Sequence, residues 1–210
     1  MEIRKAQQKD ISFIVNAIIE IESFDETNTF NNLFGTNTEQ TKKYLESFLS
    51  DEENVGNEYA LNTYSIVEID GTNAACCSLF YTDSEYYQKK SELFPIHLQR
   101  SHLFTFFENV KNLPDNKRIL THKNFLEYLF VSRAFRNKGI SKPLIENILS
   151  RTDRLYLIPL KNNNFAIEYY KRLGFILNDE IQTFPIDTAE NSIYPDSKKV
   201  MLYKDNITET

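Results

Sequence analysis

The segment from residue 125 to residue 175 constrains the fold of this 210-residue chain more strongly than any other part. Two of its stretches, 125–131 and 155–158, are apolar runs of the length that buried strands have. Two others, 141–149 and 163–173, repeat apolar residues at helical spacing. The order strand, helix, strand, helix is typical of βαβ units.

The N-terminal part of the chain predicts two helices and a hairpin. Asp10 is an expected N-cap for a helix that begins at Ile11, and Thr38 opens a second helix. Between these helices, residues 24–35 are rich in Asn and Thr and are predicted to be a loop. The expected strands before residue 82 are 2–6, 63–69 and 73–81, the last two joined by Asp70-Gly71.

Residues 82–123 interrupt the strand pattern. Their apolar residues have helical spacing, so we predict a mostly helical insertion in which Pro95 breaks or begins one helix. Its aromatic residues fit core packing, a substrate lid or a dimer face. After residue 175 we expect strands at 175–179 and 199–203, separated by a polar excursion over 180–197. The whole pattern predicts an α+β (mixed α/β) fold in a single domain, 1–210.

Net charge, cysteine placement and the length of the apolar runs disfavour several classes of protein. The formal net charge of −6 disfavours a broad nucleic-acid surface. Cys76 and Cys77 are adjacent, so on a strand they point to opposite faces, which disfavours a disulfide. The N-terminus lacks the apolar core of a signal peptide, and no apolar run approaches the ~20 residues of a membrane span. We therefore expect a cytoplasmic protein that binds neither nucleic acid nor membrane.

A basic loop lies between the first predicted strand and helix of the 125–175 segment. It contains Arg136-x-x-Gly139, and the amides at the start of the following helix can donate hydrogen bonds to a phosphate. Gly139 lets the backbone approach the anion, and the side chains of Arg136 and Lys138 add positive charge. The alternative is an ordinary strand-to-helix turn with solvated basic residues.

The second helix of the segment has a pattern of its own. Asn163-x-x-Ala166-x-x-x-Tyr170 places Ala166 and Tyr170 on one face, and Gly174 ends the helix. Tyr170 taken alone also fits a core tyrosine with a satisfied hydroxyl.

Together, the loop and the Asn163–Phe175 helix resemble the GCN5-related N-acetyltransferase (GNAT) family. The loop matches the family's Arg/Gln-x-x-Gly-x-Gly/Ala, with Ser141 as a departure in the last place. The start of the chain, Ile3 to Ala6 and Asp10-Ile11, is also similar to the family's first strand and helix. The resemblance covers most of the chain except the insertion at about 82–123 and the tail. It implies a central, mostly antiparallel, twisted sheet flanked by helices.

The resemblance also implies an acetyl-CoA site and the residues that form it. Backbone groups of one strand would pair with the pantetheine arm, and the loop amides would hold the pyrophosphate. Asn163 and Ala166 would lie beside the pantetheine, and Tyr170 beside the thioester sulfur as a catalytic acid. The strand residues are Leu129, Phe130 and Val131, and the loop residues are Arg136, Asn137, Lys138, Gly139, Ile140 and Ser141.

Glu127 is the candidate base. Strict strand alternation would place it on one face with Leu129 and Val131, opposite Tyr128 and Phe130. A carboxylate in an apolar run is costly to bury without a partner, so it is either functional or a solvated or Lys-paired side chain at an open sheet end. The run around it and Tyr169–Arg172 are similar to the branch of the family that acts on diamines and polyamines.

The expected activity is therefore N-acetyl transfer from acetyl-CoA to a primary amine of a small molecule, such as a polyamine, or of a protein. The alternative is a non-catalytic acyl-CoA-binding or interaction module of the same fold. His97, His102 and His122 lack metal-ligand spacing, so no metal is expected. Oligomeric state is open, with a homodimer as the expectation from the family.

Overall fold

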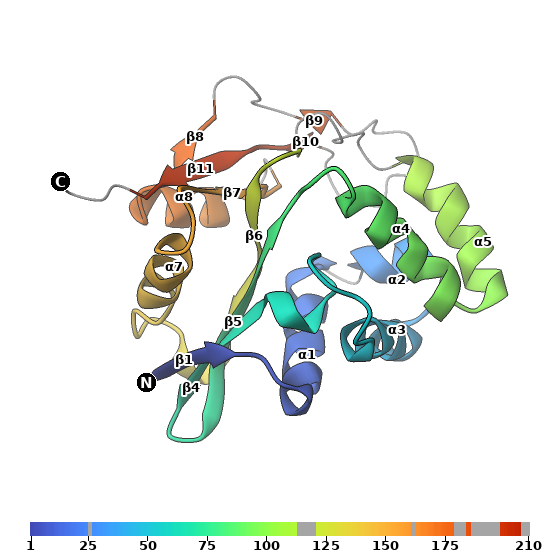
Figure 1. Ribbon diagram of the computed structural model, residues 1–210, viewed down its shortest axis with the longest axis horizontal. Coiled ribbons are helices and arrows are strands. Elements are labelled where there is room, and N and C mark those ends of the chain that lie inside the picture. Colours follow the sequence, from blue (N-terminus) through green and yellow to red (C-terminus); the bar gives the residue numbers. More distant parts are fainter. Residues whose placement is uncertain (25–26, 113–120, 161–162, 179–183, 186–197, 207–210) are drawn as a thin grey trace.

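The computed structural model describes residues 1–24, 27–112, 121–160, 163–178, 184–185 and 198–206. Its centre is a seven-stranded sheet in the order β1-β4-β5-β6-β7-β11-β8 (Figure 1). All neighbouring strands are antiparallel except β6 and β7, which are parallel. The predicted mixed fold with a mostly antiparallel sheet is therefore confirmed. The strands are β1 Glu2–Lys5, β4 Tyr64–Ile69, β5 Thr72–Tyr81, β6 Asn124–Val131, β7 Arg154–Leu157, β8 Ile176–Leu177 and β11 Leu202–Asp205.

Helices cover the two faces of the sheet unequally (Figure 1). Among the described residues, five helices on one face enclose an aromatic-rich core that includes Phe34 and Phe48. On the other face, two of the described helices pack on a core of aliphatic residues such as Leu144 and Ile148. The five are α1 Ile11–Ile21, α2 Thr29–Phe34, α3 Thr38–Ser50, α4 Tyr86–His97 and α5 Arg100–Asn109, and the two are α7 Ser141–Leu149 and α8 Asn164–Arg172. We call these the α1–α5 face and the α7–α8 face.

The prediction of a loop over residues 24–35 is wrong. The segment contains most of a small hairpin, β2 Ser23–Phe24 with β3 Thr27–Asn28, and all of α2. Asn28 caps α2, because its side chain accepts hydrogen bonds from the amides of Phe30 and Asn31 at 2.9 and 3.2 Å. Gly35 ends the helix in the left-handed region, with φ 63°. The Asn-rich composition reflects capping rather than a loop.

Other element boundaries also differ from expectation. Pro95 lies inside α4, two residues before its last residue, and neither breaks nor begins a helix. Within the expected polar excursion, β9 Phe184–Pro185 pairs with β10 Lys198–Lys199, and most of the remainder lies outside the described residues. The final strand is shifted to Leu202–Asp205. Within the expected insertion at 82–123, helices α4 and α5 lie between β5 and β6 in the sequence. Residues 113–120 of the insertion lie outside the described part of the chain.

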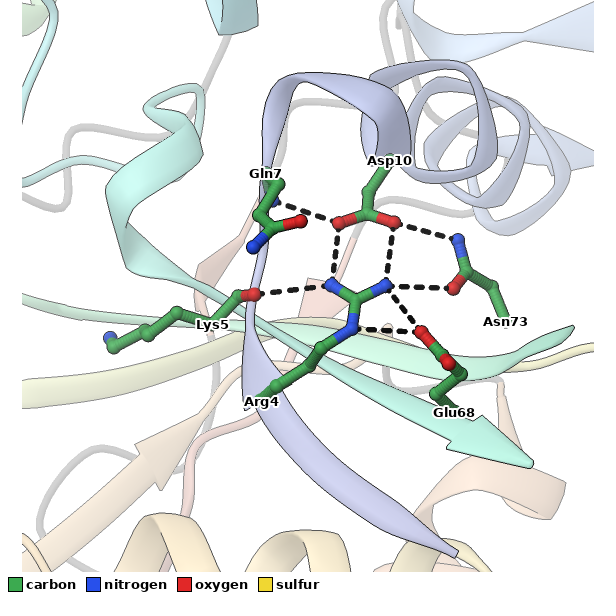
Figure 2. Close-up of polar contacts among 6 residues, drawn as sticks. All are labelled: Arg4, Lys5, Gln7, Asp10, Glu68 and Asn73. Carbon is green, nitrogen blue, oxygen red and sulfur yellow. Dashed lines mark hydrogen bonds and ion pairs between the residues drawn. The ribbon is translucent and has the colours of Figure 1, made fainter. Parts of the chain in front are cut away.

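The start of α1 is held by a network of charged and amide side chains around Arg4 (Figure 2). The Arg4 guanidinium binds Asp10 through two hydrogen bonds, of 2.7 and 3.0 Å, and Glu68 on β4 through another of 2.9 Å. Asn73 on β5 donates to Asp10 at 2.9 Å. Asp10 directly precedes α1, as expected, but its carboxylate accepts from the amide of Gln7 and does not cap the helix. The network joins β1, β4, β5 and α1.

The network changes the acidity of Asp10. Burial acts to raise its pKa, but hydrogen bonds from Arg4, Asn73 and the Gln7 amide outweigh burial and lower the pKa to about 2. A carboxylate with a lowered folded-state pKa stabilises the fold above its unfolded-state pKa. This stabilisation is lost as the pH falls through the folded-state value.

We predict that Asp10→Asn lowers the free energy of unfolding at pH 7 by about 2 kcal/mol, from a pKa difference of roughly two units. The difference from wild type should shrink as the pH falls from 4 to 2, and urea unfolding at pH 7 and pH 3 measures it. Asp70→Asn, in the exposed turn between β4 and β5, is the control and should have little effect at either pH. An equal deficit at both pH values for Asp10→Asn would contradict the prediction.

Candidate active site

Strand β6 contains a bulge in the middle of the candidate site. Its register with β5 pairs Phe130 with Cys76 but Glu127 with Ser78, so two residues of β6 lie opposite Cys77. Tyr128 has φ 53°, a left-handed conformation that is rare for a bulky residue. This is the geometry of a bulge with one extra residue, and such bulges often re-aim a side chain beside an active site.

The bulge overturns the expected alternation of side chains. Leu129 and Val131 contact the aliphatic core of the α7–α8 face, as does Leu126. Directly opposite pairs share a face, and Ser78 lies on the face of Cys76, so Glu127 lies on the α1–α5 face. Tyr128 lies there too, because the bulge places two consecutive residues on one side. The prediction that Glu127 shares a face with Leu129 and Val131 is therefore wrong.

Strands β6 and β7 part where the bulge begins. Their register pairs Asn124 with Leu155 and Phe125 with Tyr156, and in the described residues it extends no further. Beyond Phe125, β6 continues for six residues, to Val131. The β7-facing backbone of this part of β6 is thus not covered by the neighbouring strand. An extended ligand could pair with it there, as the resemblance implies for Leu129, Phe130 and Val131.

The loop after β6 leads into the N-terminus of α7. Asn137 and Gly139 both have left-handed backbone conformations, with φ 62° and 72°. A Cβ on Gly139 would meet nothing within 4 Å, so glycine is needed there for its conformation and not for close packing. Ile140 precedes the helix and provides no side-chain cap. The first amides of α7 are therefore suited to an anionic ligand.

The structure corrects the expected role of the Arg136 side chain. Its guanidinium turns back to the end of β6, where Nε donates to the carbonyl of Val131 at 3.0 Å and Nη2 binds Glu20 at 2.7 Å. Glu20 is on α1, so this ion pair joins the loop to the other face of the sheet. Because Glu20 compensates its charge, Arg136 adds less positive charge to the loop than predicted. Lys138 is exposed, with its ammonium 5.1 Å from the centre of the Phe135 ring.

Helix α8 positions Tyr170 on the α7–α8 face. Asn163 caps this helix by accepting a hydrogen bond from the amide of Ala166 at 3.0 Å. Tyr170 is half-buried against the aliphatic core, and its ring meets Phe175 edge-on with 5.5 Å between centres. Burial raises the pKa of Tyr170, and the negative charge of Glu127 raises it further. Its hydroxyl is therefore protonated at neutral pH and can donate a proton.

Glu127 and Tyr170 come from opposite faces of the sheet, yet they are within electrostatic reach. The same carboxylate also contributes to raising the pKa of Tyr64 and Tyr86 on the α1–α5 face, where burial is the largest cause. The charge of Glu127 thus acts on tyrosines of both faces of the sheet. This arrangement places a candidate base and a candidate acid on the two sides of the point where β6 leaves β7.

Sequence reasoning missed a contact between the two motifs. The Ser141 hydroxyl, at the start of α7, is hydrogen-bonded to the Tyr169 hydroxyl on α8. Ser141 is the residue that departs from the family pattern, and Tyr169 precedes the candidate acid. The small hydroxyl therefore joins the loop to the tyrosine helix. The only signal of this contact in the sequence was that Ser141 stands where the family's loop pattern has Gly or Ala.

His97 and His102 lie among the helices of the α1–α5 face, and the two cysteines lie on β5 opposite the bulge. His97 connects α4 to α3 by bonding Ser47 and Asp51, and His102 on α5 bonds Tyr44 at 2.6 Å. The two cysteines are free thiols, buried on opposite faces of the sheet, as predicted. Within the described residues, no group of three or more His, Cys, Asp or Glu side chains could hold a metal ion. The helices described there include none long and apolar enough to span a membrane.

Comparison with known proteins finds a family match in the C-terminal half of the chain. Residues 107–177 match the family model of the acetyltransferase (GNAT) domain, a segment that runs from α5 through β6, α7, β7 and α8 to β8. The matched segment contains both the Arg136–Ser141 loop and the Asn163–Phe175 helix, so the resemblance to the GNAT family inferred from these two elements is confirmed over residues 107–177.

Solved GNAT structures share the fold. An N-acetyltransferase from Staphylococcus aureus Mu50 is similar with a TM-score of 0.72 and 15% identity, over 97% of this chain and 100% of that chain. A mutant spermidine N-acetyltransferase from Vibrio cholerae gives 0.52 and 12%, over 98% and 95%. A ribosomal-protein-alanine N-acetyltransferase from Brucella melitensis gives 0.51 and 12%, over 98% and 99%. None of the curated proteins compared matches the chain.

Proposed function

We propose that this protein is an acetyl-CoA-dependent N-acetyltransferase that acylates a primary amine of a small molecule or of a protein. The observation that carries the proposal is the placement of Glu127 and Tyr170 on opposite faces of the sheet, on either side of the parting of β6 and β7. This arrangement lets the amine approach from the α1–α5 face while the thiol leaves toward the α7–α8 face. The match of residues 107–177 to the acetyltransferase domain supports it.

Acetyl-CoA would bind along the α7–α8 side of this opening. The pyrophosphate would accept hydrogen bonds from the amides between Arg136 and Ser141, at the uncapped N-terminus of α7. The pantetheine arm would pair with the backbone of Leu129–Val131, beside Asn163 and Ala166. The thioester would then lie between Glu127 and Tyr170.

The reaction is aminolysis of a thioester. Glu127 removes a proton from the ammonium group, directly or through water, and the neutral amine attacks the thioester carbonyl. The oxyanion that forms accepts a hydrogen bond from a backbone amide, for which the bulge at Tyr128 is the candidate because a bulge leaves its extra residue unpaired. The carbon–sulfur bond then breaks, and Tyr170 donates its proton to the leaving thiolate. The attacking nitrogen gives its remaining extra proton to water, which leaves the neutral amide and free CoA, and Tyr170 regains a proton from solvent.

The acceptor is expected to be an amine because related folds act on amines. The spermidine and the ribosomal-protein-alanine N-acetyltransferases, both similar in fold to this chain, are named for a small polyamine and for a protein amine. The similarity of the run around Glu127 to the diamine and polyamine branch favours a small-molecule acceptor.

The direct test has two parts. Calorimetry should detect binding of acetyl-CoA at or below millimolar concentration, and release of CoA should be observed with a panel of primary amines. A protein that binds acetyl-CoA but releases no CoA with any amine would be the non-catalytic module. The absence of binding at millimolar acetyl-CoA would contradict both functions.

We predict that Tyr170→Phe lowers kcat by about a hundredfold, since a general acid typically contributes 10²–10⁴-fold. Acetyl-CoA affinity should change less than twofold, because phenylalanine keeps the ring contact with Phe175. Steady-state kinetics and calorimetry on the same preparation measure both. Tyr203→Phe on β11 is a matched control and should retain wild-type turnover. Unchanged kcat in Tyr170→Phe would make Tyr170 a purely structural residue.

We predict that Glu127→Gln weakens activity mainly at the lower end of the pH range. At low pH almost all acceptor is protonated and needs a base, whereas at high pH free amine is already present. The loss in kcat/KM should be about a hundredfold at pH 7 and smaller at pH 9.5. A pH–rate profile measures it, with Glu2→Gln at the exposed N-terminal strand as the control. An unchanged profile would remove Glu127 from the mechanism.

A further inference from the structure

A buried carboxylate on the α1–α5 face already holds an alkylammonium group. Glu58, in the segment between α3 and β4, is 7% exposed. One carboxylate oxygen accepts a hydrogen bond from the Tyr86 hydroxyl at 2.6 Å, and the other is ion-paired with the ammonium of Lys90 on α4. The ammonium also lies 5.3 and 5.6 Å from the ring centres of Tyr59 and Tyr86. A carboxylate with two aromatic rings is a site that recognises a primary ammonium.

This ammonium box (Glu58, Tyr59 and Tyr86) is connected to the candidate base. The Tyr86 ring stacks on Phe80 with 5.4 Å between centres, and Phe80 pairs with Phe125 in β6, two residues before Glu127 and on the same face. A second connection runs from Ser78, the partner of Glu127, through a 2.8 Å hydrogen bond to Thr63. Thr63 in turn donates to the carbonyl of Asn57, the neighbour of Glu58. Glu58 and Glu127 thus lie on one face, are connected through these intervening residues, and both contribute to raising the pKa of Tyr86.

The ammonium of Lys90 can leave the ammonium box more easily than the carboxylate of Glu58 can move. The Lys90 side chain is 26% exposed, and its neighbours Gln88 and Lys89 on α4 are exposed, so its ammonium can turn out to water. The carboxylate of Glu58 is held by the hydrogen bond from the Tyr86 hydroxyl and stays buried when the Lys90 ammonium turns outward. A surface cavity lined by Asn57, Asp83 and Tyr86, among others, adjoins the box. It offers a route by which another cation could reach Glu58.

We propose that the ammonium box binds the second, non-reacting ammonium of a diamine acceptor, and that Lys90 occupies the box in the free protein. The inference rests on the proposed function, because it assigns the amine that is acetylated to Glu127 and the distal ammonium to Glu58. Lys90 is therefore a competitor in the same chain, and acceptor binding displaces it. A monoamine can react without filling the box.

The proposal predicts opposite effects for the two partners of the ion pair. With 1,4-diaminobutane as the probe, Glu58→Gln should raise KM at least tenfold, since the ammonium loses its carboxylate. Lys90→Met should lower KM at least threefold, because it removes the competitor and keeps an apolar side chain of similar length. Butylamine should show KM values within twofold of wild type in both variants, and so should acetyl-CoA.

Controls separate recognition from folding. Lys111→Met and Glu108→Gln alter an exposed ion pair at the end of α5, away from this cavity, and should leave all KM values unchanged. The double variant Glu58→Gln/Lys90→Met buries no unpaired charge, so it should fold even if Glu58→Gln alone does not, and it should keep the raised KM for 1,4-diaminobutane. An increase in this KM for Lys90→Met would overturn the proposal, because it would make the pair a purely structural ion pair.

A binding measurement separates failure of this inference from failure of the proposed function. Calorimetry with 1,4-diaminobutane and no acetyl-CoA should detect binding that is stronger in Lys90→Met and lost in the double variant. Such binding would support the diamine subsite even in a protein that releases no CoA. Equal turnover of butylamine and 1,4-diaminobutane, with no effect of the double variant, would overturn the subsite and leave the N-acetyltransferase activity standing.

Discussion

One extra residue in β6 is the constraint on which the arrangement of the site depends. The left-handed conformation of Tyr128 reverses the alternation of side chains in the middle of a strand that is otherwise regular. It turns Glu127 to the α1–α5 face while Leu129 and Val131 face α7 and α8. Without the bulge, either Glu127 or these two aliphatic residues would lie on the wrong side of the sheet. Because the buried contacts of Tyr128 and Phe130 hold the strand on both sides of the bulge, packing can compensate for the strained backbone.

The sequence was sufficient for those parts of the structure that local patterns determine. The order of the seven strands of the central sheet, the loop before α7 and the glycine after α8 follow from periodicity and from glycine placement, whereas the β2–β3 hairpin and α2 do not. The bulge did not follow, since Glu127-Tyr128-Leu129 contains no glycine and tyrosine favours regular strands. The side chain of Arg136 did not follow either, because its partner Glu20 is 116 residues away. Long-range partners and a strained backbone are settled by tertiary packing, which local patterns do not record.

The same division explains why the match to the acetyltransferase domain does not specify the acceptor. The match to the acetyltransferase domain begins at residue 107, so it contains the strands and helices expected to hold acetyl-CoA. Helices α1 to α4 and the segment with Glu58 all precede it. Most of the helices of the α1–α5 face therefore lie outside the matched segment, and the match gives no information about their residues.

The burial of both cysteines determines how thiol-directed reagents act on this protein. The chain has only Cys76 and Cys77, and each is fully covered, one by each layer of helices. Burial raises the pKa of Cys77 to about 12 and that of Cys76 well above its usual value, so neither forms the reactive thiolate in the folded state. A chromogenic disulfide added to the folded protein would meet no reactive thiol of its own. The reagent would therefore measure a thiol released in solution without a background signal from the protein. Slow labelling of Cys76 or Cys77 would report separation of the helices from the sheet.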